Sequence, residues 1–197
     1  MPRPICADCG VHPNICVCKD CAPVPNRTRV SVLQHPTEVG HPKGTVRILN
    51  QCLARLELFK GETPEDFREA GFDTHTVSRN PALLFPGRGS EAIETSDVSQ
   101  VDHWVILDGT WRKAARILHQ NPALASLPRF HLASPPASAY TIRKAPGSHH
   151  LATAEAVAYL LNVVEPGLDT RPISRAMRTL VDKQFAQIPA RLYKHYQ

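Results

Sequence analysis

A short apolar strand that leads directly into an amphipathic helix constrains the fold of this chain more than any other feature of its sequence. His103–Leu107 (HWVIL) is apolar, as expected for a buried strand, and Asp108 and Gly109 follow it. Residues Trp111–Gln120 then repeat apolar side chains at helical spacing. The predicted apolar face of that helix consists of Trp111, Ala114, Ala115 and Leu118. A strand and a helix joined by so short a turn are typical of α/β proteins.

The same alternation recurs along the chain. Further strands are predicted at Arg29–Gln34, Ala82–Phe85 and Phe130–Ala133. Further helices are predicted at Thr45–Phe59, with Cys52 in the core, at Thr153–Val164 and at Ser174–Ile188. Residues 88–102 and 134–147 read as loops. The fold class is therefore α/β with a mostly parallel sheet, and ligands are expected beyond the carboxyl ends of its strands.

Length and charge narrow the class of protein. The 197 residues suit one main domain with a small appendage, predicted as a Cys-rich knuckle at residues 1–25 and an α/β domain at residues 26–197. Lys and Arg exceed Asp and Glu by 23 to 18, a net charge of +5, which suits a polyanionic partner. No apolar run approaches the roughly 20 residues of a membrane span, and no secretory leader is evident, so we expect a cytoplasmic protein without a membrane partner.

Five of the six cysteines lie within the first 21 residues, spaced Cys6-x2-Cys9-x6-Cys16-x-Cys18-x2-Cys21. Structural zinc takes four thiolate or imidazole ligands, and Cys-x2-Cys brings two sulfurs to one point. The first two cysteines form one such pair. The second pair is either the third and fourth cysteines or the fourth and fifth, and His12 is a further candidate ligand. Four thiolates close the coordination sphere, so the predicted site is structural.

The sequence around the turn Asp108-Gly109-Thr110-Trp111 matches neither a haloacid dehalogenase phosphatase site nor a common nucleotide-binding loop. In a haloacid dehalogenase phosphatase the nucleophilic Asp stands two residues before the Asp-Gly-Thr, where this chain has Ile106. Neither a G-x-G-x-x-G fingerprint nor a Walker loop is present. Asp108 remains as a carboxylate at a strand end, able to act as a general base or to hold a ligand amine. Thr110 suits an N-cap, and Trp111 suits either the core or a pocket wall.

Cationic residues follow this turn on the predicted helix. Arg112 and Arg116 share one helical face, and Lys113 is nearby. They form either a solvated surface or a stripe that contacts phosphates.

Several ordered segments resemble the DTW-domain family, which has an Asp-x-Thr-Trp motif. The matching segments are the Cys6–Cys18 knuckle, Leu33–Glu38 (LQHPTE), Leu83–Gly87 (LLFPG), Leu107–Ala114 (LDGTWRKA), Asn121–Arg129, Tyr140–Pro146 (YTIRKAP) and Leu151–Ala156 (LATAEA). The last segment departs from the family's frequent Leu-Ser-Thr, because Ala152 replaces the Ser.

The resemblance implies a tRNA-uridine aminocarboxypropyltransferase. Such enzymes move the 3-amino-3-carboxypropyl group of S-adenosylmethionine to N3 of a uridine and release methylthioadenosine. Similar bacterial members modify the variable loop of tRNA, at position 47. The implied fold is related to the SPOUT-type methyltransferases and the ribosomal RNA aminocarboxypropyltransferases, with a C-terminal trefoil knot.

The resemblance also implies roles for individual residues. The implied catalytic set is Asp108, Thr110 and Trp111. The implied cofactor-binding residues are Leu84, Phe85, Pro86, Gly87, Leu107, Gly109, Ile142, Arg143, Lys144, Pro146, Thr153 and Glu155. The implied tRNA-binding residues are Arg112, Lys113, Arg116, Arg129 and His35, although His35 equally suits a structural role. The implied zinc ligands are Cys6, Cys9, Cys16 and Cys18, with Cys21 as an extra thiol.

Two other functions fit the same sequence. An RNA methyltransferase would use the same pocket and release S-adenosylhomocysteine. A non-catalytic RNA-binding adaptor would use the knuckle and would bind no cofactor. The sequence does not determine the oligomeric state.

Overall fold

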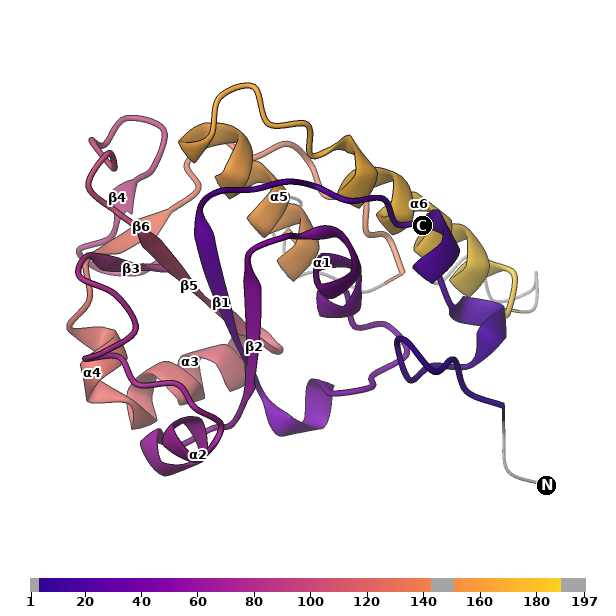
Figure 1. Ribbon diagram of the computed structural model, residues 1–197, viewed down its shortest axis with the longest axis horizontal. Helices are drawn as coiled ribbons and strands as arrows, with labels where there is room; N and C mark the ends of the chain where they lie inside the picture. Colours follow the sequence, from indigo (N-terminus) through magenta and orange to yellow (C-terminus); the bar gives the residue numbers. More distant parts are fainter. Residues whose placement is uncertain (1–3, 143–150, 189–197) are drawn as a thin grey trace.

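The computed structural model describes residues 4–142 and 151–188 and consists of a parallel β-sheet covered on both faces by helices (Figure 1). The strands are β1 (Arg29–Gln34), β2 (Leu56–Lys60), β3 (Pro81–Leu84), β4 (Glu91–Ala92), β5 (His103–Asp108) and β6 (Arg129–His131). The α-helices are α1 (Val46–Cys52), α2 (Pro64–Glu69), α3 (Trp111–Gln120), α4 (Pro122–Ala125), α5 (Thr153–Val164) and α6 (Arg171–Phe185). Three short 3₁₀ helices are η1 (Pro13–Ile15), η2 (Cys18–Asp20) and η3 (Pro36–Glu38).

Every strand pairing in the described residues is parallel, in the order β2-β1-β5-β3-β6-β4. The expectation of a mostly parallel α/β sheet is confirmed. Strand β5 lies at the centre, and every one of its six residues is buried. This matches the continuous apolar sequence, because a parallel strand covered on both faces has no polar side.

The two faces of the sheet have separate cores. Trp104 and Ile106 of β5 pack toward α1, α5 and α6, whereas Val105 and Leu107 pack toward α2, α3 and α4. Alternate residues of one strand therefore serve opposite layers. At about 25 cal/mol per Å² of apolar area removed from water, such burial is the main stabilising contribution.

The predicted helix over residues 45–59 is wrong in its second half. Helix α1 ends at Cys52, and Leu56–Lys60 forms β2, the edge strand that pairs with β1 from Val30–Leu56 to Gln34–Lys60. In the segment LELFK only Leu56-Glu57-Leu58 alternates apolar and polar residues, so the strand signal is short, and the apolar spacing also suits a helix. Cys52 is buried, as expected.

Other boundaries differ in smaller ways. The loop predicted over residues 88–102 contains the short strand β4. Helix α6 begins at Arg171 rather than Ser174, with Pro172 in its first turn, where a missing N–H costs nothing. On α3 the buried side chains are Ala114 and Ile117, while Trp111 is 42% exposed and Ala115 is also exposed, so the predicted apolar face is wrong for these two residues. None of the helices in residues 4–142 and 151–188 is long and apolar enough to cross a membrane.

The Cys-rich segment docks on the helical layer formed by α1 and α6 (Figure 1). Lys183 of α6 donates from Nζ to the carbonyl oxygen of Cys16 at 2.5 Å and to Asp20 Oδ2 at 3.1 Å. Arg47 of α1 donates from Nη2 to the carbonyl oxygen of Ile15 at 3.4 Å. Polar contacts from two helices therefore set the position of this segment against the sheet domain.

Candidate functional site

Asp108 lies at the carboxyl end of the central strand and is held by two side chains from distant parts of the chain. Gln34, at the end of β1, donates from Nε2 to Asp108 Oδ2 at 2.8 Å. Thr153, at the start of α5, donates from Oγ1 to Asp108 Oδ1 at 2.6 Å. The residue is only 7% exposed. Each carboxylate oxygen has one lone-pair direction occupied by a donor, so the carboxylate is fixed in place.

The turn after Asp108 confirms the capping prediction. Thr110 has extended backbone angles, and its hydroxyl accepts a hydrogen bond from the Lys113 backbone N–H at 3.4 Å. A Cβ at Gly109 would lie 3.0 Å from the Lys113 Cβ and 3.6 Å from the His35 Cβ. The glycine therefore lets the helix start close to the end of β1.

An apolar cleft opens beside this turn, between the ends of β3 and β5 and the start of α5. Its lining includes seven predicted site residues: Leu84, Phe85, Pro86, Leu107, Gly109, Trp111 and Thr153. The rings of Phe85 and Trp111 lie with centroids 5.9 Å apart and planes tilted by 55°. An exposed indole packed against a second ring suits the wall of a ligand site. The sequence left Trp111 either in the core or in a pocket wall, and the structure places it in the wall of this cleft.

Two predicted cofactor residues have structural contacts instead of facing this cleft. The Glu155 carboxylate accepts hydrogen bonds from the backbone N–H of Ala152 at 2.8 Å, from Ala139 N–H at 2.8 Å and from the Ser138 hydroxyl at 2.7 Å. It therefore caps α5 and holds the preceding loop, so free capacity for a ligand ammonium is small. Ile142 is buried, and its carbonyl oxygen accepts a hydrogen bond from Lys43 Nζ at 3.0 Å.

Of the remaining predicted cofactor residues, the structure describes only Gly87. Gly87 follows Phe85 and Pro86, and a Cβ there would approach Arg129 Nη1 to 3.2 Å. Arg143, Lys144 and Pro146 lie outside the described residues.

The predicted RNA-binding cations differ in their surroundings. Lys113 Nζ contacts Glu38 Oε1 at 2.7 Å, and Arg116 forms an ion pair with Glu62. Neutralised cations contribute less to phosphate binding. Arg112 lies on the exposed side of α3.

Arg129 and His35 complete the predicted RNA-binding set. Arg129 donates to the Ala125 carbonyl oxygen at 3.3 Å. His35 is 7% exposed, with Nδ1 2.9 Å from Thr37 Oγ1 and Nε2 3.2 Å from Glu62 Oε2. Both ring nitrogens of His35 therefore have partners, which favours the structural role for this residue.

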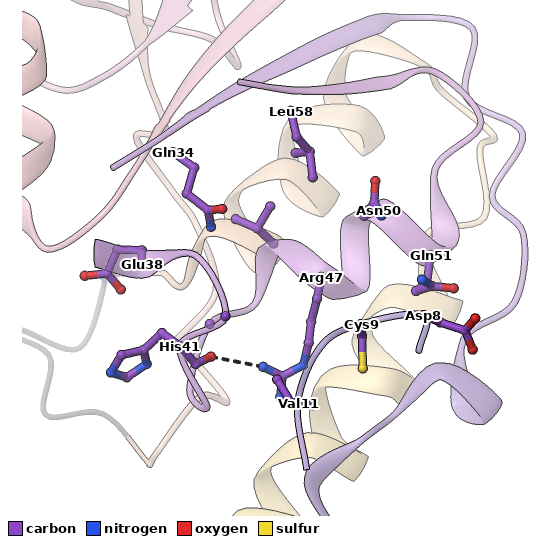
Figure 2. Close-up of a pocket in the computed structure, with 13 residues that line it drawn as sticks. Asp8, Cys9, Val11, Gln34, Glu38, His41, Arg47, Asn50, Gln51 and Leu58 are labelled. Atoms are coloured by element: carbon purple, nitrogen blue, oxygen red, sulfur yellow. Dashed lines mark hydrogen bonds between the residues drawn. The ribbon is translucent and has the colours of Figure 1, made fainter. Parts of the chain in front are cut away.

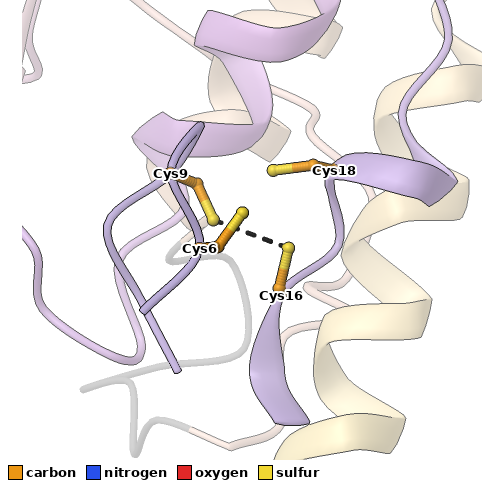
Figure 3. Close-up of side chains that lie close together, drawn as sticks. All are labelled: Cys6, Cys9, Cys16 and Cys18. Atoms are coloured by element: carbon orange, nitrogen blue, oxygen red, sulfur yellow. Dashed lines mark hydrogen bonds between the residues drawn. The ribbon is translucent and has the colours of Figure 1, made fainter. Parts of the chain in front are cut away.

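Four thiols converge at the N-terminal knuckle (Figure 3). The sulfurs of Cys6, Cys9, Cys16 and Cys18 all lie within 4.8 Å of one another. Cys9 Sγ and Cys16 Sγ are 3.7 Å apart. Neighbouring sulfurs in a tetrahedral site with Zn–S bonds of about 2.3 Å lie about 3.8 Å apart. The donor set and its spacing thus fit a metal ion that prefers tetrahedral thiolate coordination.

The structure also selects between the alternatives left by the cysteine spacing. The second pair is Cys16 with Cys18, and Cys21 is not in the group. His12 caps η1 instead, with Nδ1 accepting a hydrogen bond from the Asn14 backbone N–H at 3.2 Å.

Gln34 is the functional candidate that sequence reasoning missed. It follows a buried strand, as Asp108 does, and the two are register partners across the parallel pair β1–β5. Its position as the last residue of a predicted strand was the available signal, since carboxyl ends of neighbouring parallel strands meet at one edge.

Comparison with known proteins agrees with this geometry. The model of the DTW domain matches residues 3–185. A Macaca fascicularis protein named tRNA-uridine aminocarboxypropyltransferase 2 is 26% identical over 170 residues, which cover 83% of this chain and 57% of the relative. A Drosophila melanogaster protein of the same name is 31% identical over 162 residues, which cover 80% of this chain and 64% of the relative.

The chain thus spans less than two thirds of the length of these curated relatives. No solved structure matches it. The family match covers the knuckle, the sheet and the Asp108 turn, and the chain therefore belongs to the DTW domain family.

Proposed function

We propose that this protein is a tRNA-uridine 3-(3-amino-3-carboxypropyl)transferase that uses S-adenosylmethionine. The observation that carries the proposal is the fixed carboxylate of Asp108 at the carboxyl end of β5, beside an apolar cleft walled by Phe85 and Trp111. The activity named for the two relatives supports it. A uridine of the tRNA variable loop, at position 47, is the proposed acceptor, and a cytoplasmic location suits it.

The proposed reaction forms a bond from uridine N3 to the aminocarboxypropyl carbon and breaks the bond from that carbon to sulfur. The sulfonium becomes the neutral thioether methylthioadenosine, and the N3 proton leaves. The apolar cleft suits the adenosine and methyl groups, with Phe85 and Trp111 offering ring faces. Positioning of N3, carbon and sulfur in line would supply most of the acceleration.

Asp108 suits either of two roles in that reaction. As a general base it would accept the N3 proton, a contribution of about 10²–10⁴-fold. As an anchor it would hold the ammonium of the transferred group, because a carboxylate that Gln34 and Thr153 fix in place presents a negative charge at the end of β5. Thr153 links the carboxylate to the apolar cleft in both cases.

The metal and the fold belong to the same proposal. The four-cysteine group suits one structural Zn²⁺, which would hold the knuckle together. We also propose residues 1–25 as a separate knuckle unit, and a SPOUT-like arrangement with a C-terminal knot for residues 26–197. Arg112, with its exposed position on α3, is the proposed phosphate contact nearest the Asp108 turn.

One experiment tests the activity against both alternatives. The protein is incubated with bulk tRNA and S-adenosylmethionine, and the nucleosides and the small-molecule product are identified by mass spectrometry. Aminocarboxypropyluridine together with methylthioadenosine is the expected result. A methylated base with S-adenosylhomocysteine would identify a methyltransferase instead. RNA binding with no cofactor uptake in calorimetry would identify an adaptor.

A further inference from the structure

A second cleft, lined by charged and amide side chains that the first one lacks, lies between the cysteine knuckle and the sheet (Figure 2). We call it the knuckle cleft. The residues that define it are Asp8 of the knuckle, Gln34 at the end of β1, Glu38 of η3, Arg47 and Asn50 of α1, and Leu58 of β2. It is built from five separate parts of the fold, and none of the predicted cofactor residues lines it.

The two clefts are joined through Asp108. Gln34 lines the knuckle cleft, and Thr153 lines the apolar cleft. These two side chains bind opposite oxygens of the Asp108 carboxylate, at 2.8 and 2.6 Å. Asp108 is therefore hydrogen-bonded directly to one lining residue of each cleft, although it is not itself among the lining residues of either. A transfer reaction needs its two substrates on either side of the reacting atoms.

The charges of the knuckle cleft favour a neutral occupant. Glu38 is 4% exposed and pairs with Lys113, and Asp8 adds a second carboxylate. Arg47 is turned toward the protein, donating to the carbonyl oxygens of His41 at 3.2 Å, Pro42 at 3.0 Å and Ile15 at 3.4 Å. Its cationic group is thus occupied by backbone acceptors, as Figure 2 shows for His41. A phosphate in this cleft would lie near two carboxylates and near a guanidinium that already donates to backbone carbonyl oxygens. Its binding would therefore be unfavourable.

The remaining groups match an unstacked nucleobase. Leu58 is 38% exposed on the edge strand and points into the cleft, offering an apolar surface for the face of a ring (Figure 2). The amides of Gln34 and Asn50 offer donors for base carbonyl oxygens. Single-stranded RNA is read by such a combination of a packing surface and polar groups at the base edge.

We infer that the knuckle cleft receives the acceptor uracil of the RNA, turned out of its loop, with its N3 directed past Gln34 toward Asp108. The inference rests on the proposed function for the identity of the base. It also assigns a task to the knuckle beyond its own stability, because Asp8 and Cys9 form one wall of the acceptor site. Extruding a nucleotide costs a few kcal/mol, which a built pocket offsets.

Photocrosslinking tests the location without needing turnover. A tRNA transcript containing 4-thiouridine is bound to the protein and irradiated, and the crosslinked peptides are identified by mass spectrometry. We expect crosslinks to peptides that contain Gln34 or the α1–β2 segment, residues 46–58. Crosslinks confined to α3 and the apolar cleft would overturn the inference.

Two substitutions test the same cleft by kinetics. Leu58→Trp fills it, and we expect KM for tRNA to rise at least tenfold while the Kd for S-adenosylmethionine, measured by calorimetry, stays within twofold. Asn50→Leu removes one hydrogen-bonding group and is expected to raise KM about three- to tenfold. Glu69→Trp places the same indole on the exposed side of α2 as a control. Thermal melts establish that each variant is folded.

The outcomes separate this inference from the proposed function. Transfer activity in the wild type with unchanged KM in both cleft variants would overturn the inference and leave the function standing. Crosslinks in the cleft without any transfer would support a base-binding site and reject the proposed reaction. An equal loss of cofactor affinity and tRNA affinity in Leu58→Trp would contradict the separation of the two clefts.

Discussion

The cysteine knuckle and the Asp108 site are both clusters of side chains, yet they are assembled in opposite ways. The four thiols of the knuckle all lie between Cys6 and Cys18, so a short segment supplies the whole cluster. The Asp108 site joins residues 74 and 45 positions away from Asp108. Few residues of the knuckle are buried, so we expect it to depend on a bound metal ion, whereas the Asp108 site is built on a buried sheet. We therefore expect removal of the metal to disrupt the knuckle, and substitution of a side chain to disrupt the Asp108 site.

Removing the metal is the strongest way to sharpen this comparison. We expect about one zinc per chain by elemental analysis. Structural zinc contributes apparent binding energies of about 10–16 kcal/mol in small zinc domains. Chelation or Cys9→Ser should therefore abolish hydrogen-exchange protection in the knuckle while β1 and β5 keep theirs.

Cys21→Ser serves as the matched control, because Cys21 lies outside the four-cysteine group. It should retain one zinc and the same exchange pattern. Full zinc content in Cys9→Ser would show that the four-cysteine assignment is wrong.

Asp108→Asn tests the distributed site, with the next largest effect. The substitution keeps the size of the side chain and removes its charge, so the protein should remain folded. We expect transfer to fall by about 10²–10⁴-fold, whether the charge accepts a proton or holds an ammonium.

The two roles differ in their pH dependence. If Asp108 is the base, the residual activity of Asp108→Asn should rise with pH as N3 loses its proton to hydroxide. If Asp108 holds the ammonium, the KM for S-adenosylmethionine should rise instead. Activity within threefold of wild type would remove Asp108 from the mechanism.

Glu165 offers a moderate test of the sheet domain alone. Its buried carboxylate accepts hydrogen bonds from the backbone N–H groups of Thr28, at 2.6 Å, and Arg27, at 3.0 Å, holding the entry to β1. Burial acts to raise the pKa of this carboxyl, but the hydrogen bonds from Thr28 and Arg27 outweigh it, so the pKa is lowered. Glu165→Ala should reduce the free energy of unfolding by about 1–3 kcal/mol in urea denaturation.

The sign of the pH effect follows from that lowered pKa. The stabilisation from Glu165 is fully present above the pKa of an unfolded Glu, about 4.3, and is lost as the pH falls through the lower folded value. The difference between wild type and Glu165→Ala should therefore shrink only in acid. Glu69→Gln, at an exposed carboxylate of α2, is the control for general charge effects. A difference that persists unchanged at pH 2 would contradict this account.

The smallest predicted effect is a gain at the start of α5. Ala152 has extended N-cap angles and accepts no side-chain hydrogen bond, although Glu155 already supplies the reciprocal half of a capping box. Ala152→Ser adds the missing acceptor for an orphan N–H and should raise stability by about 0.5–1 kcal/mol. Thermal denaturation measures the gain, and Ala156→Ser, within the helix, should show none.

Local signals predicted much of the fold and part of the site. The boundaries of β1 and α3, the Thr110 cap and the buried Cys52 are confirmed, because each depends on neighbouring residues in sequence. The helix predicted over residues 45–59 is wrong over Leu56–Lys60, because these residues form an edge strand that pairs with β1. That pairing depends on the sheet, which the local sequence does not reveal. Helical spacing does not reveal which neighbours cover a surface, so the sequence left Trp111 either in the core or in a pocket wall, and the structure places it on the apolar cleft.

By itself, the sequence determined the clustered thiols, the alternation of strands and helices, and a carboxylate at the end of a buried strand, all of which are written within a few consecutive residues. Tertiary structure alone decided that Gln34 and Thr153 bind Asp108, that Glu155 caps a helix, and that the knuckle walls a second cleft. The physical reason is the parallel sheet, which brings the carboxyl ends of strands to one edge regardless of their separation along the chain.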